Sequence, residues 1–459
     1  MIKFRAVLMA ASLFVLPATA GAATISLGEA LGVAYETNPQ LGAAQAGLRA
    51  TDEEVAKANA GWRPSINASG GWGPQQANIS GFGTISAHPL QGQVTIVQPL
   101  FRGGRTYADI GRAKALVRAG RAQLLATEQS VLLDAATAYM DVVRDEEAVK
   151  LQQANVDVLK QQRAETQQRF NVGELTRTDV SQAQARFAGA QSAATAARGR
   201  LAASRAVFAQ VVGRIPETLE NAPTLPQLPQ TPEAALELAL QSNPALVSAR
   251  ENARAADYAV DSAVGALLPS VALQGQYQYQ RGGFNTFSSG LPGESGALSM
   301  TQKLTSIQGV VNVPIYQGGA DEAAVRQVKQ YRSQAEMNIV ASDREVRQAV
   351  QSAWETYVSA RATIDSNAEQ LKADTIAFEG VKREQQVGGR TTLDVLNAQQ
   401  ELLNSQLASV VAERNTVVAA FQLLAASGKL TAKDLGLKVK FYDPVEHYDD
   451  NAARWIGLD

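Results

Sequence analysis

The stretch NVGELTRTDV at residues 171–180 returns as QVGGRTTLDV at residues 386–395, a shift of 215 residues. Each copy places a Val-Gly pair between two segments whose apolar residues recur with the period of an α-helix, so each copy predicts a reversal between two helices. The same shift carries PLFRGG at residues 99–104 onto PIYQGG at residues 314–319. We therefore predict that the chain consists of two related halves.

The duplication organises the chain into five predicted segments. A basic start, an apolar run and a small-residue ending have the pattern of a secretory signal peptide. Four prolines between the halves indicate an extended connector. The predicted segments are the signal peptide at residues 1–22, the first repeat at residues 23–215, the connector at residues 216–230, the second repeat at residues 231–427 and a C-terminal tail at residues 428–459.

Composition excludes several classes of protein. The formal net charge is −2 and no Lys/Arg stripe is present, which argues against a nucleic-acid partner. The chain has no cysteine, which excludes a disulfide framework and a lipid-anchoring Cys at the cleavage site. We find no run after the signal peptide that approaches the roughly 18 to 20 apolar residues of a transmembrane helix. Any later membrane contact must then be made in another way.

Long helices dominate the prediction. Residues 104–170 and 319–386 contain no proline and little glycine, and each predicts one very long helix. Shorter helices are expected before the strands, where Asn38-Pro39 and Asn243-Pro244 interrupt them, and after each Val-Gly turn. The first long helix has the seven-residue spacing of a coiled coil at Ile110, Val117, Leu124, Val131 and Ala138.

Two strands are predicted in each repeat. In the clearest of them Val271, Leu273, Tyr277 and Tyr279 alternate with an amide ladder formed by Gln274, Gln276 and Gln278. The Gly- and Ser-rich segments at about residues 75–90 and 284–302 are predicted to be loops, and PLFRGG and PIYQGG are predicted to be sharp strand-to-helix bends. The four strands are expected at residues 63–74, 91–101, 268–282 and 304–316.

The amide ladder has two interpretations. It fits an exposed sheet face of a soluble protein, and it fits a transmembrane β-strand with an apolar outside and a wet inside. The signal peptide and the tyrosine pair favour the second. Four strands cannot close a barrel and an open edge cannot face lipid, so this interpretation requires an oligomer.

Catalytic chemistry finds no support in the sequence. The two histidines, His88 and His447, stand apart, and no Gly-rich phosphate loop follows a strand. We therefore predict no catalytic residue, no metal site, no cofactor and no enzymatic activity.

Taken together, the signal peptide, the duplicated helix–hairpin–helix plan, the two bends and the Val-Gly turns resemble the TolC family of outer-membrane channel-tunnels. The likeness covers about residues 24–440. Residues 430–437 and Tyr442-Asp443-Pro444 look closer to the type I secretion members than to the lipid-anchored efflux members, and the missing cysteine agrees with this.

The resemblance implies a mainly α-helical fold with a small β part. Duplicated coiled-coil hairpins would form a periplasmic α-barrel, and the four strands of each chain would join a trimeric twelve-stranded transmembrane β-barrel. It also implies a homotrimer in outer-membrane lipid of a Gram-negative bacterium, and the C-terminal tail would lie in the periplasm. Its partners would be a periplasmic adaptor protein and an inner-membrane transporter of the ABC type. The adaptor-docking tip would comprise Val172, Gly173, Glu174, Leu175, Val387, Gly388 and Gly389.

The family's gate falls on the helix after the second turn. Where the family has two aspartates three residues apart, this sequence has Asp394 and Asn397. Arg390 with Thr178 and Asp179 match residues that link neighbouring coils in the closed state, whereas the family's linking tyrosine falls on Gln385. The gate set implied by the resemblance is therefore Asp394, Asn397, Arg390, Gln385, Thr178 and Asp179, and Gln274, Gln276 and Gln278 would line the barrel.

A structural role competes for the same carboxylates. Thr176 with Asp179 and Thr391 with Asp394 both have the spacing of a capping box at a helix start, and an acidic residue in a first turn is favoured by the helix dipole. The sequence leaves both roles open.

The sequence thus predicts an exit duct for type I protein secretion. Two alternatives stay open, namely an outer-membrane factor for efflux of small molecules and an exported coiled-coil stalk without a pore.

Overall fold

The computed structural model describes residues 24–79, 83–216, 218–220, 226–282 and 301–457. The predicted signal peptide and most of the predicted 284–302 loop lie outside these residues. The chain divides into two compact units, and each takes segments from both halves of the sequence. Unit 1 holds residues 1–34, 134–225 and 361–418, and unit 2 holds residues 35–133, 226–360 and 419–459.

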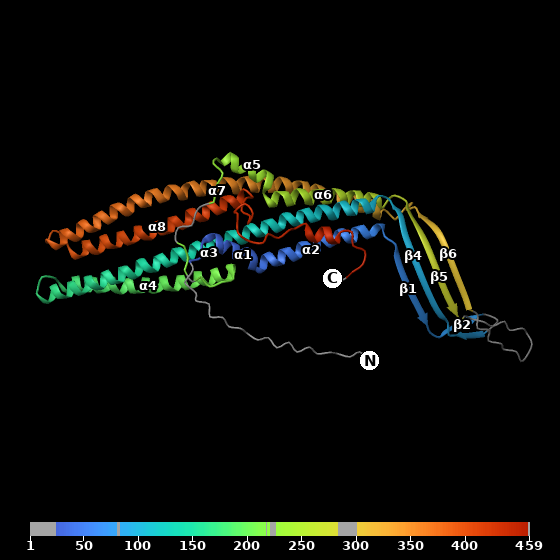
Figure 1. The fold of residues 1–459 in the computed structure, drawn as a ribbon, viewed down its shortest axis with the longest axis horizontal. Helices are drawn as coiled ribbons and strands as arrows, with labels where there is room; N and C mark the ends of the chain where they lie inside the picture. The colour runs from blue at the N-terminus through green and yellow to red at the C-terminus, as the bar shows by residue number, and fades with distance from the viewer. Residues whose placement is uncertain (1–23, 80–82, 217, 221–225, 283–300, 458–459) are drawn as a thin grey trace, which may run out of the picture. The chain divides into compact units, whose positions relative to one another are not determined.

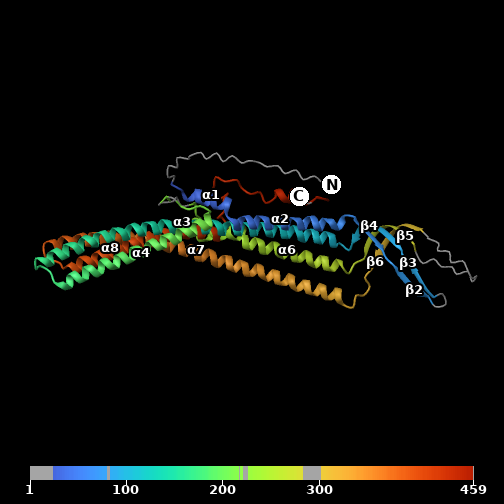
Figure 2. The same cartoon turned by 90° about the horizontal axis from the view of Figure 1, so that it is seen from below.

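The helices occur in the same order in both halves, and the two long helices are confirmed (Figure 1). In Figures 1 and 2, α4 turns back along α3 and α8 turns back along α7. The helices are α1 (Leu27–Thr37), α2 (Pro39–Asn59), the short 3₁₀ helix η1 (Ala60–Trp62), α3 (Arg105–Asn171), α4 (Arg177–Val212), α5 (Pro232–Ser242), α6 (Pro244–Gly265), α7 (Ala320–Gln386), α8 (Thr392–Ala426) and α9 (Glu446–Asn451).

The Asn-Pro pairs divide the helices as the sequence predicts. Asn38 Oδ1 accepts a hydrogen bond from Gln40 N at 2.9 Å, and Asn243 Oδ1 accepts one from Ala245 N at 3.0 Å. The following proline occupies the first helical position, where its missing N–H costs nothing. Each pair therefore ends one helix and caps the next.

One antiparallel sheet carries strands from both halves in the order β1-β4-β5-β6. The four predicted strands are confirmed in position, although the last begins and ends earlier than predicted. It stops before Pro314, which cannot donate to a strand ladder. The strands are β1 (Ser65–Trp72), β4 (Leu90–Arg102), β5 (Ser270–Arg281) and β6 (Thr301–Asn312).

The predicted loop at residues 75–90 is wrong in part. A small antiparallel hairpin, β2 (Gln75–Ile79) with β3 (Gly83–Ala87), forms there. Its Ser and Gly content indicated a loop, but β-branched residues such as Ile79 and Ile85 favour extended backbone once a partner strand is beside them.

Glycine pairs make the strand-to-helix bends, as predicted. Gly103 has φ +64° and Gly318 has φ +67°. A side chain added at Gly103 would place its Cβ 2.2 Å from the carbonyl oxygen of Gly265, whereas one added at Gly318 would meet nothing within 4 Å. The first bend is therefore packed against the end of α6, and the second lies in open space within the chain.

Tyr139 fixes the middle of unit 1. Its side chain is fully buried, and its Oη lies 2.9 Å from the carbonyl oxygens of both Ile25 and Glu220. The same oxygen accepts a hydrogen bond from Glu220 N at 2.9 Å. Burial raises the pKa of Tyr139 to about 12. One hydroxyl thus ties α3 to the start of the described chain and to the connector.

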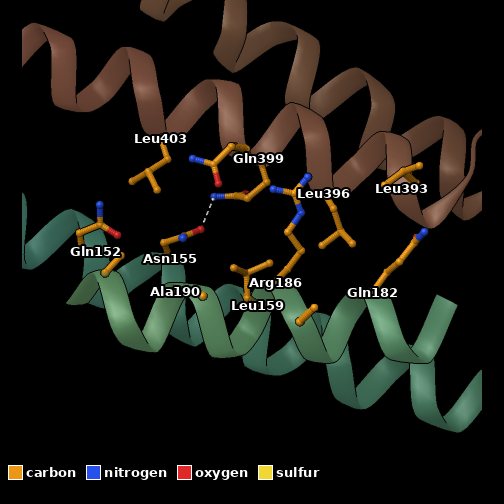
Figure 3. Close-up of a pocket in the computed structure, with 14 residues that line it drawn as sticks. Gln152, Asn155, Leu159, Gln182, Arg186, Ala190, Leu393, Leu396, Gln399 and Leu403 are labelled. Carbon is orange, nitrogen blue, oxygen red and sulfur yellow. Dashed lines mark hydrogen bonds between the residues drawn. The ribbon is translucent and has the colours of Figure 1, made fainter. Parts of the chain in front are cut away.

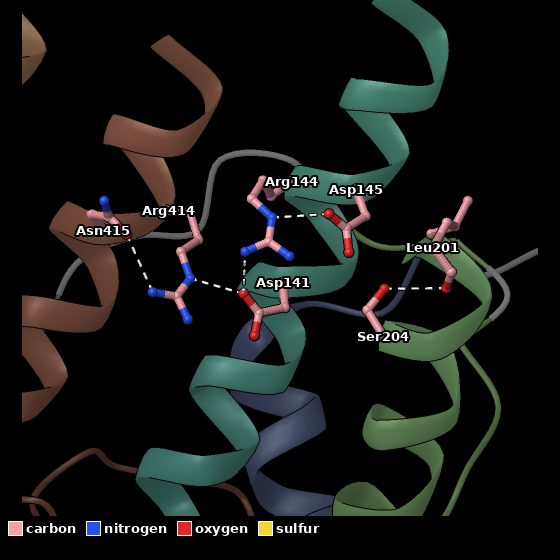
Figure 4. A network of polar contacts seen from close by, with 7 residues as sticks. All are labelled: Asp141, Arg144, Asp145, Leu201, Ser204, Arg414 and Asn415. Atoms are coloured by element: carbon pink, nitrogen blue, oxygen red, sulfur yellow. Dashed lines mark hydrogen bonds and ion pairs between the residues drawn. The ribbon is translucent and has the colours of Figure 1, made fainter. Parts of the chain in front are cut away.

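An ionic network joins α3 to α8 in the same unit (Figure 4). Arg144 and Arg414 both donate to Asp141 Oδ1 at 2.9 Å, and Arg144 Nε also donates to Asp145 Oδ1 at 2.9 Å. Asp145 is buried, and removing one cation from such a network would leave a buried carboxylate without compensation. The network therefore connects helices of the two halves.

Unit 2 has an apolar cluster where α5, α6, α7 and α8 meet. Ala235, Leu246, Val346 and Leu423 are each less than 5 % exposed. Trp354 packs against this cluster and is half-buried. Burying such aliphatic side chains supplies most of the stability of a helical assembly.

One described helix, α8, is long and apolar enough to cross a membrane by length and composition alone. The sequence-based expectation that no run after the signal peptide reaches this threshold is wrong for α8. Half of its most apolar window is buried inside the chain, and Leu396, Leu403 and Leu423 of α8 are all buried. Packing within the chain accounts for this apolar composition.

Candidate functional site

The first helix reversal, which we call the first tip, comprises residues 172–176. Gly173 has φ +85°, a conformation that glycine adopts without strain. Gly173 N donates to Phe170 O and Glu174 N donates to Arg169 O, both at 2.9 Å. The last carbonyls of α3 are therefore satisfied by a left-handed cap.

The second tip, residues 387–391, has the same construction. Gly388 has φ +82°. Its N–H donates to Gln385 O at 3.1 Å, and Gly389 N donates to Glu384 O at 2.8 Å. The two predicted helix reversals are thus confirmed as tight turns. Val172 is 73 % exposed and Val387 is 85 % exposed, so both tips present an apolar side chain to the surroundings.

Both predicted capping boxes are present. Asp179 Oδ2 accepts from Thr176 N at 3.0 Å and from Thr176 Oγ1 at 2.7 Å, and these bonds lower the pKa of Asp179. Asp394 Oδ2 accepts from Thr391 N at 2.9 Å and from its Oγ1 at 2.8 Å, which lowers the pKa of Asp394. The capping role of both aspartates is confirmed, and the gate role of Asp394 stays a prediction.

A salt bridge closes each tip, with the charges exchanged between them. At the first tip Arg169 Nε lies 2.9 Å from Glu174 Oε2, and at the second Arg390 Nε lies 2.8 Å from Glu384 Oε2. The 215-residue shift places Glu384 at the position of Arg169. In the single chain Arg390 therefore holds its own turn, and its predicted link to a neighbouring coil through Thr178 or Asp179 stays a prediction.

The other predicted gate residues lie close to these turns. Gln385 is half-buried in the last turn of α7, and Thr178 is exposed in the first turn of α4. Asn397 Oδ1 accepts a hydrogen bond from Arg186 Nη2 at 3.1 Å, which links α8 to α4. At the first tip Glu174 is exposed and Leu175 is half-buried.

A groove of about 510 Å³ begins beside the tips, between α3, α4 and α8 (Figure 3). Its polar lining includes Gln152, Asn155, Gln182 and Arg186, and Gln399 Nε2 donates to Asn155 Oδ1 at 3.4 Å. Its apolar lining consists of Leu159, Ala190, Leu393, Leu396 and Leu403, together with small residues of α4.

Sequence reasoning missed this groove, although a signal was present. Ala185, Gly189 and Ala193 lie four residues apart on α4 and all line it. Small side chains at that spacing leave one face of a helix hollow. The signal could not identify which helix lies opposite, because α8 comes from the other half of the sequence.

The register of the sheet separates two chemically different faces. Directly paired residues of antiparallel strands point to the same side. Gln274, Gln276 and Gln278 pair with Val97, Thr95 and Gln93 on one side and with Gln308, Ser306 and Leu304 on the other. Asn67 and Ser69 of β1 continue this face through their pairing with β4. The amide ladder is thus part of a polar face that crosses all four strands.

The opposite face is largely apolar. Val271 pairs with Val311 and Phe101, and Tyr277 pairs with Val94. Ile66 and Trp72 of β1 lie on this face and are 68 % and 75 % exposed. The described part of the chain leaves both side chains largely uncovered. The predicted alternation of the strands is therefore confirmed, and its apolar side is open to the surroundings.

Comparison with known proteins decides the family. The family model described as "Outer membrane efflux protein" matches residues 30–214 and 235–429. The chain belongs to this family. The two matched segments correspond to the two halves that the sequence predicts.

Individual members of the family are similar to the chain over most of its length. The outer membrane efflux protein BepC of Brucella suis is 36 % identical over 429 residues, covering 94 % of this chain and 91 % of that protein. The outer membrane protein TolC of Vibrio cholerae is 26 % identical over 424 residues, covering 90 % of this chain and 94 % of that one. The alkaline protease secretion protein AprF of Pseudomonas aeruginosa is 25 % identical, covering 75 % and 70 %. The predicted relationship to TolC is confirmed.

Solved structures confirm the fold. The crystal structure of a membrane protein from Pseudomonas aeruginosa superimposes with a TM-score of 0.77 at 18 % identity, covering 90 % of this chain and 92 % of that one. The efflux family shares a channel-tunnel fold with a helical barrel and a β-barrel part, and its members are channels of the outer membrane that extend into the periplasm. The chain is accordingly an outer-membrane export channel, and the alternative of a stalk without a pore is wrong.

Proposed function

We propose that this chain forms a homotrimeric exit duct that conducts substrate passively from an inner-membrane transporter across the periplasm and outer membrane. The observation that carries the trimer is the four-stranded sheet, in which β1 and β6 each have one neighbour within the described chain. An unpaired strand edge cannot face lipid. Pairing β6 of one copy with β1 of the next closes twelve strands with three copies, and a small barrel needs about eight or more.

In this trimer the polar face of the sheet lines the lumen and the apolar face contacts lipid. The cysteine-free chain allows a direct test by single substitutions, Gln276→Cys for the lumen and Tyr277→Cys for the lipid side. A membrane-impermeant thiol reagent should label the first and spare the second in intact outer membranes. Equal labelling at both positions would contradict the orientation.

The two tips and the adjoining groove are the proposed docking surface for a periplasmic adaptor. The exposed Val172 and Val387 and the apolar lining of the groove support a contact with a helical partner. Gly173→Val and Gly388→Val force a β-branched residue into a left-handed conformation and should stop export while trimers persist in the membrane. Gly380→Val is the matched control, because its added side chain meets nothing within 4 Å and its backbone is helical. Normal export by both tip variants would refute the docking proposal.

At the mouth of the duct, three copies of Asp394 would form one ring of negative charge, which favours cations. Asn397 supplies no second charged ring, so polyvalent cations should block this channel more weakly than a relative with two rings. The proposed duct performs no chemistry of its own and requires no cofactor.

The proposed cargo is a protein secreted by a type I system with an ABC transporter. The tail segments at residues 430–437 and 442–444 support this, as does the likeness to a protease secretion protein. Small-molecule efflux is the second candidate, favoured by the 36 % identity to a protein named for efflux. A strain that lacks the gene tests the choice by two measurements, the proteins secreted into the culture medium and the susceptibility of the cells to drugs. Loss of a secreted protein with unchanged susceptibility supports type I secretion, whereas the reverse result supports efflux.

A further inference from the structure

The C-terminal tail returns to the junction between sheet and helices in unit 2. Its helix α9 lies on α2, where His447 Nδ1 is 3.4 Å from Oδ2 of the buried Asp52. The guanidinium of Arg121 lies 5.3 Å from the ring centroid of Tyr448, which packs on the cluster around Val55. The contact of His447 with Asp52, the stacking of Arg121 on Tyr448 and the apolar packing thus hold α9 against α2 and α3.

Beyond α9 the tail is fastened next to the entry of β1. Asn59 Nδ2 donates to Ala452 O at 2.8 Å, and Arg63 donates to Ala453 O at 3.1 Å and to Arg454 O at 2.5 Å. The guanidinium of Arg63 also lies 4.9 Å from the ring centroid of Trp455. Because β1 begins at Ser65, these bonds place the end of the tail at the level where the sheet starts.

Large apolar side chains at this level are uncovered in the chain. Trp455 is 68 % exposed, Ile456 is 91 % exposed and Tyr107 is 73 % exposed. Tyr107 meets Trp62 edge to face, with ring centroids 5.4 Å apart. The apolar face of the sheet reaches the same end through Phe101, which is 46 % exposed. The exposed tail therefore lies at the end of the sheet where the face that meets the membrane in the proposed duct begins.

We propose that residues 452–457 form a second membrane anchor, in which Trp455 and Ile456 enter the phospholipid headgroup region at the helix end of the sheet. The anchor rests on the proposed orientation of the sheet in the membrane. Tryptophan and tyrosine favour the headgroup region because their rings combine an apolar body with a polar edge. Arg454 is exposed beside Trp455 and matches the charge of lipid phosphates. If Trp455 were instead covered by protein, the exposed charge of Arg454 beside it would have no evident role.

Four tryptophans in the chain make the anchor measurable. A variant that keeps only Trp455, with Trp62, Trp72 and Trp354 replaced by Phe, is reconstituted in phosphatidylethanolamine and phosphatidylglycerol vesicles. These contain lipids brominated either near the headgroup or deep in the acyl chain. Trp455 emission should lie at shorter wavelength than that of free tryptophan in buffer, and it should lose more intensity with shallow bromine than with deep bromine.

Two matched variants calibrate this result. A chain that keeps only Trp72, on the apolar face of β1, should be quenched by brominated lipid, and one that keeps only Trp354, in the unit 2 cluster, should not. Adding Arg63→Gln to the Trp455-only chain removes the guanidinium that holds Ala453, Arg454 and Trp455, so its lipid quenching should fall while trimers persist. The same substitution in the Trp72-only chain should leave the quenching of Trp72 unchanged.

Several outcomes would overturn the anchor. Quenching of Trp455 by aqueous acrylamide but not by lipid bromine would place the tail in water. Protection from both quenchers would mean that a neighbouring copy covers it. If Arg63→Gln leaves the lipid quenching of Trp455 unchanged, the contacts of Arg63 do not hold Trp455 in the membrane, which contradicts the proposed anchor. Loss of quenching at Trp72 as well would overturn the orientation of the sheet itself, which separates a failure of the anchor from a failure of the proposed duct.

Discussion

Helices α3 and α7 have equal length, 67 residues each, and equivalent places in the two halves, yet they are buried to very different extents. Tyr139 and Val142 are among many buried side chains of α3. By contrast, α7 buries Val325, Val346 and Val350, and it exposes Met337 by 63 %. Its own chain buries much of α3, whereas one face of α7 is exposed, and in the proposed trimer a neighbouring chain would cover that face.

Equivalent positions show where the two halves kept the same role. Val131 and Val346 are related by the 215-residue shift, and both are buried. Ala122 and Met337 are related in the same way, but the small residue is buried and the large one is exposed. The small residue therefore packs within the chain, and the large one is available for packing between chains in the proposed trimer.

The largest effect is expected from truncating the buried aromatic residue of α3. Tyr139→Ala should cost about 3 to 5 kcal/mol of unfolding free energy, because it opens a cavity and removes the hydroxyl that serves Ile25 and Glu220. The equivalent residue of α7 is Trp354, which is only half-buried, so Trp354→Ala should cost less despite its larger ring. Thermal unfolding of both purified variants measures this. If Trp354→Ala lowers the unfolding free energy as much as Tyr139→Ala or more, the difference in burial between α3 and α7 does not determine stability.

The next effect concerns assembly. Met337→Glu combined with Val340→Glu places two charges on one exposed face of α7, since residues three apart on a helix are neighbours. We expect the trimer to dissociate while the helical circular dichroism signal is retained. Size-exclusion chromatography with light scattering measures the mass in mild detergent. An intact trimer would show that this face of α7 is covered by solvent and not by a neighbouring chain.

A smaller effect separates the two capping aspartates. Asp179→Ala and Asp394→Ala remove equivalent caps and should lower the melting temperature by similar small amounts. Only Asp394→Ala should reduce cation selectivity in single-channel recordings, because only that carboxylate belongs to the proposed ring. If both variants keep the selectivity of the parent channel, Asp394 acts as a cap alone.

The same aspartates give a pH dependence. Hydrogen bonds from Thr176 and Thr391 lower the pKa values of Asp179 and Asp394 in the folded chain. Their stabilisation is therefore fully present near neutral pH and is lost as pH falls through the lowered values. Melting curves recorded across the acidic range should show the parent chain approaching the stability of the two alanine variants. A constant difference at all pH values would contradict this assignment.

The smallest effect distinguishes two partners for Arg390. Arg390→Ser and Glu384→Gln both remove the salt bridge of the second tip, which is exposed and contributes little to stability. If Arg390 also holds a neighbouring coil in the trimer, only Arg390→Ser should raise the conductance of the closed channel. Arg169→Gln at the first tip is the matched control and should leave conductance unchanged. Equal conductance in all three variants would restrict Arg390 to its own turn.

Local patterns predicted those parts of the fold that depend on neighbours in sequence. The alternation of Tyr277 with Gln276 predicted the two faces of β5, and the spacing of Thr391 and Asp394 predicted a capping box. Both features arise within one strand or one helical turn, so a short stretch of sequence contains their cause. The short hairpin of β2 and β3 was not predicted, because the Gly and Ser content of the segment indicated a loop more strongly than its β-branched residues indicated strands.

Contacts between distant segments could not be predicted in this way. Asp52 and His447 come from opposite ends of the chain, and no periodic pattern connects them. The groove needs α8 opposite the small residues of α4, and only the geometry of the turn identifies Glu384 as the partner of Arg390. The gate and the trimer depend on contacts between copies of the chain, and no local pattern in the sequence shows which residues of two copies meet.

The two strand-to-helix bends have unequal freedom to diverge. At Gly103 a side chain is opposed twice, by the positive φ and by the carbonyl of Gly265. At Gly318 only the backbone conformation opposes it, and asparagine tolerates that conformation better than most residues. Gly318→Asn is therefore tolerated within the chain, whereas Gly103→Asn is not. The two copies of this duplicated motif should accordingly accept substitutions at different rates during evolution.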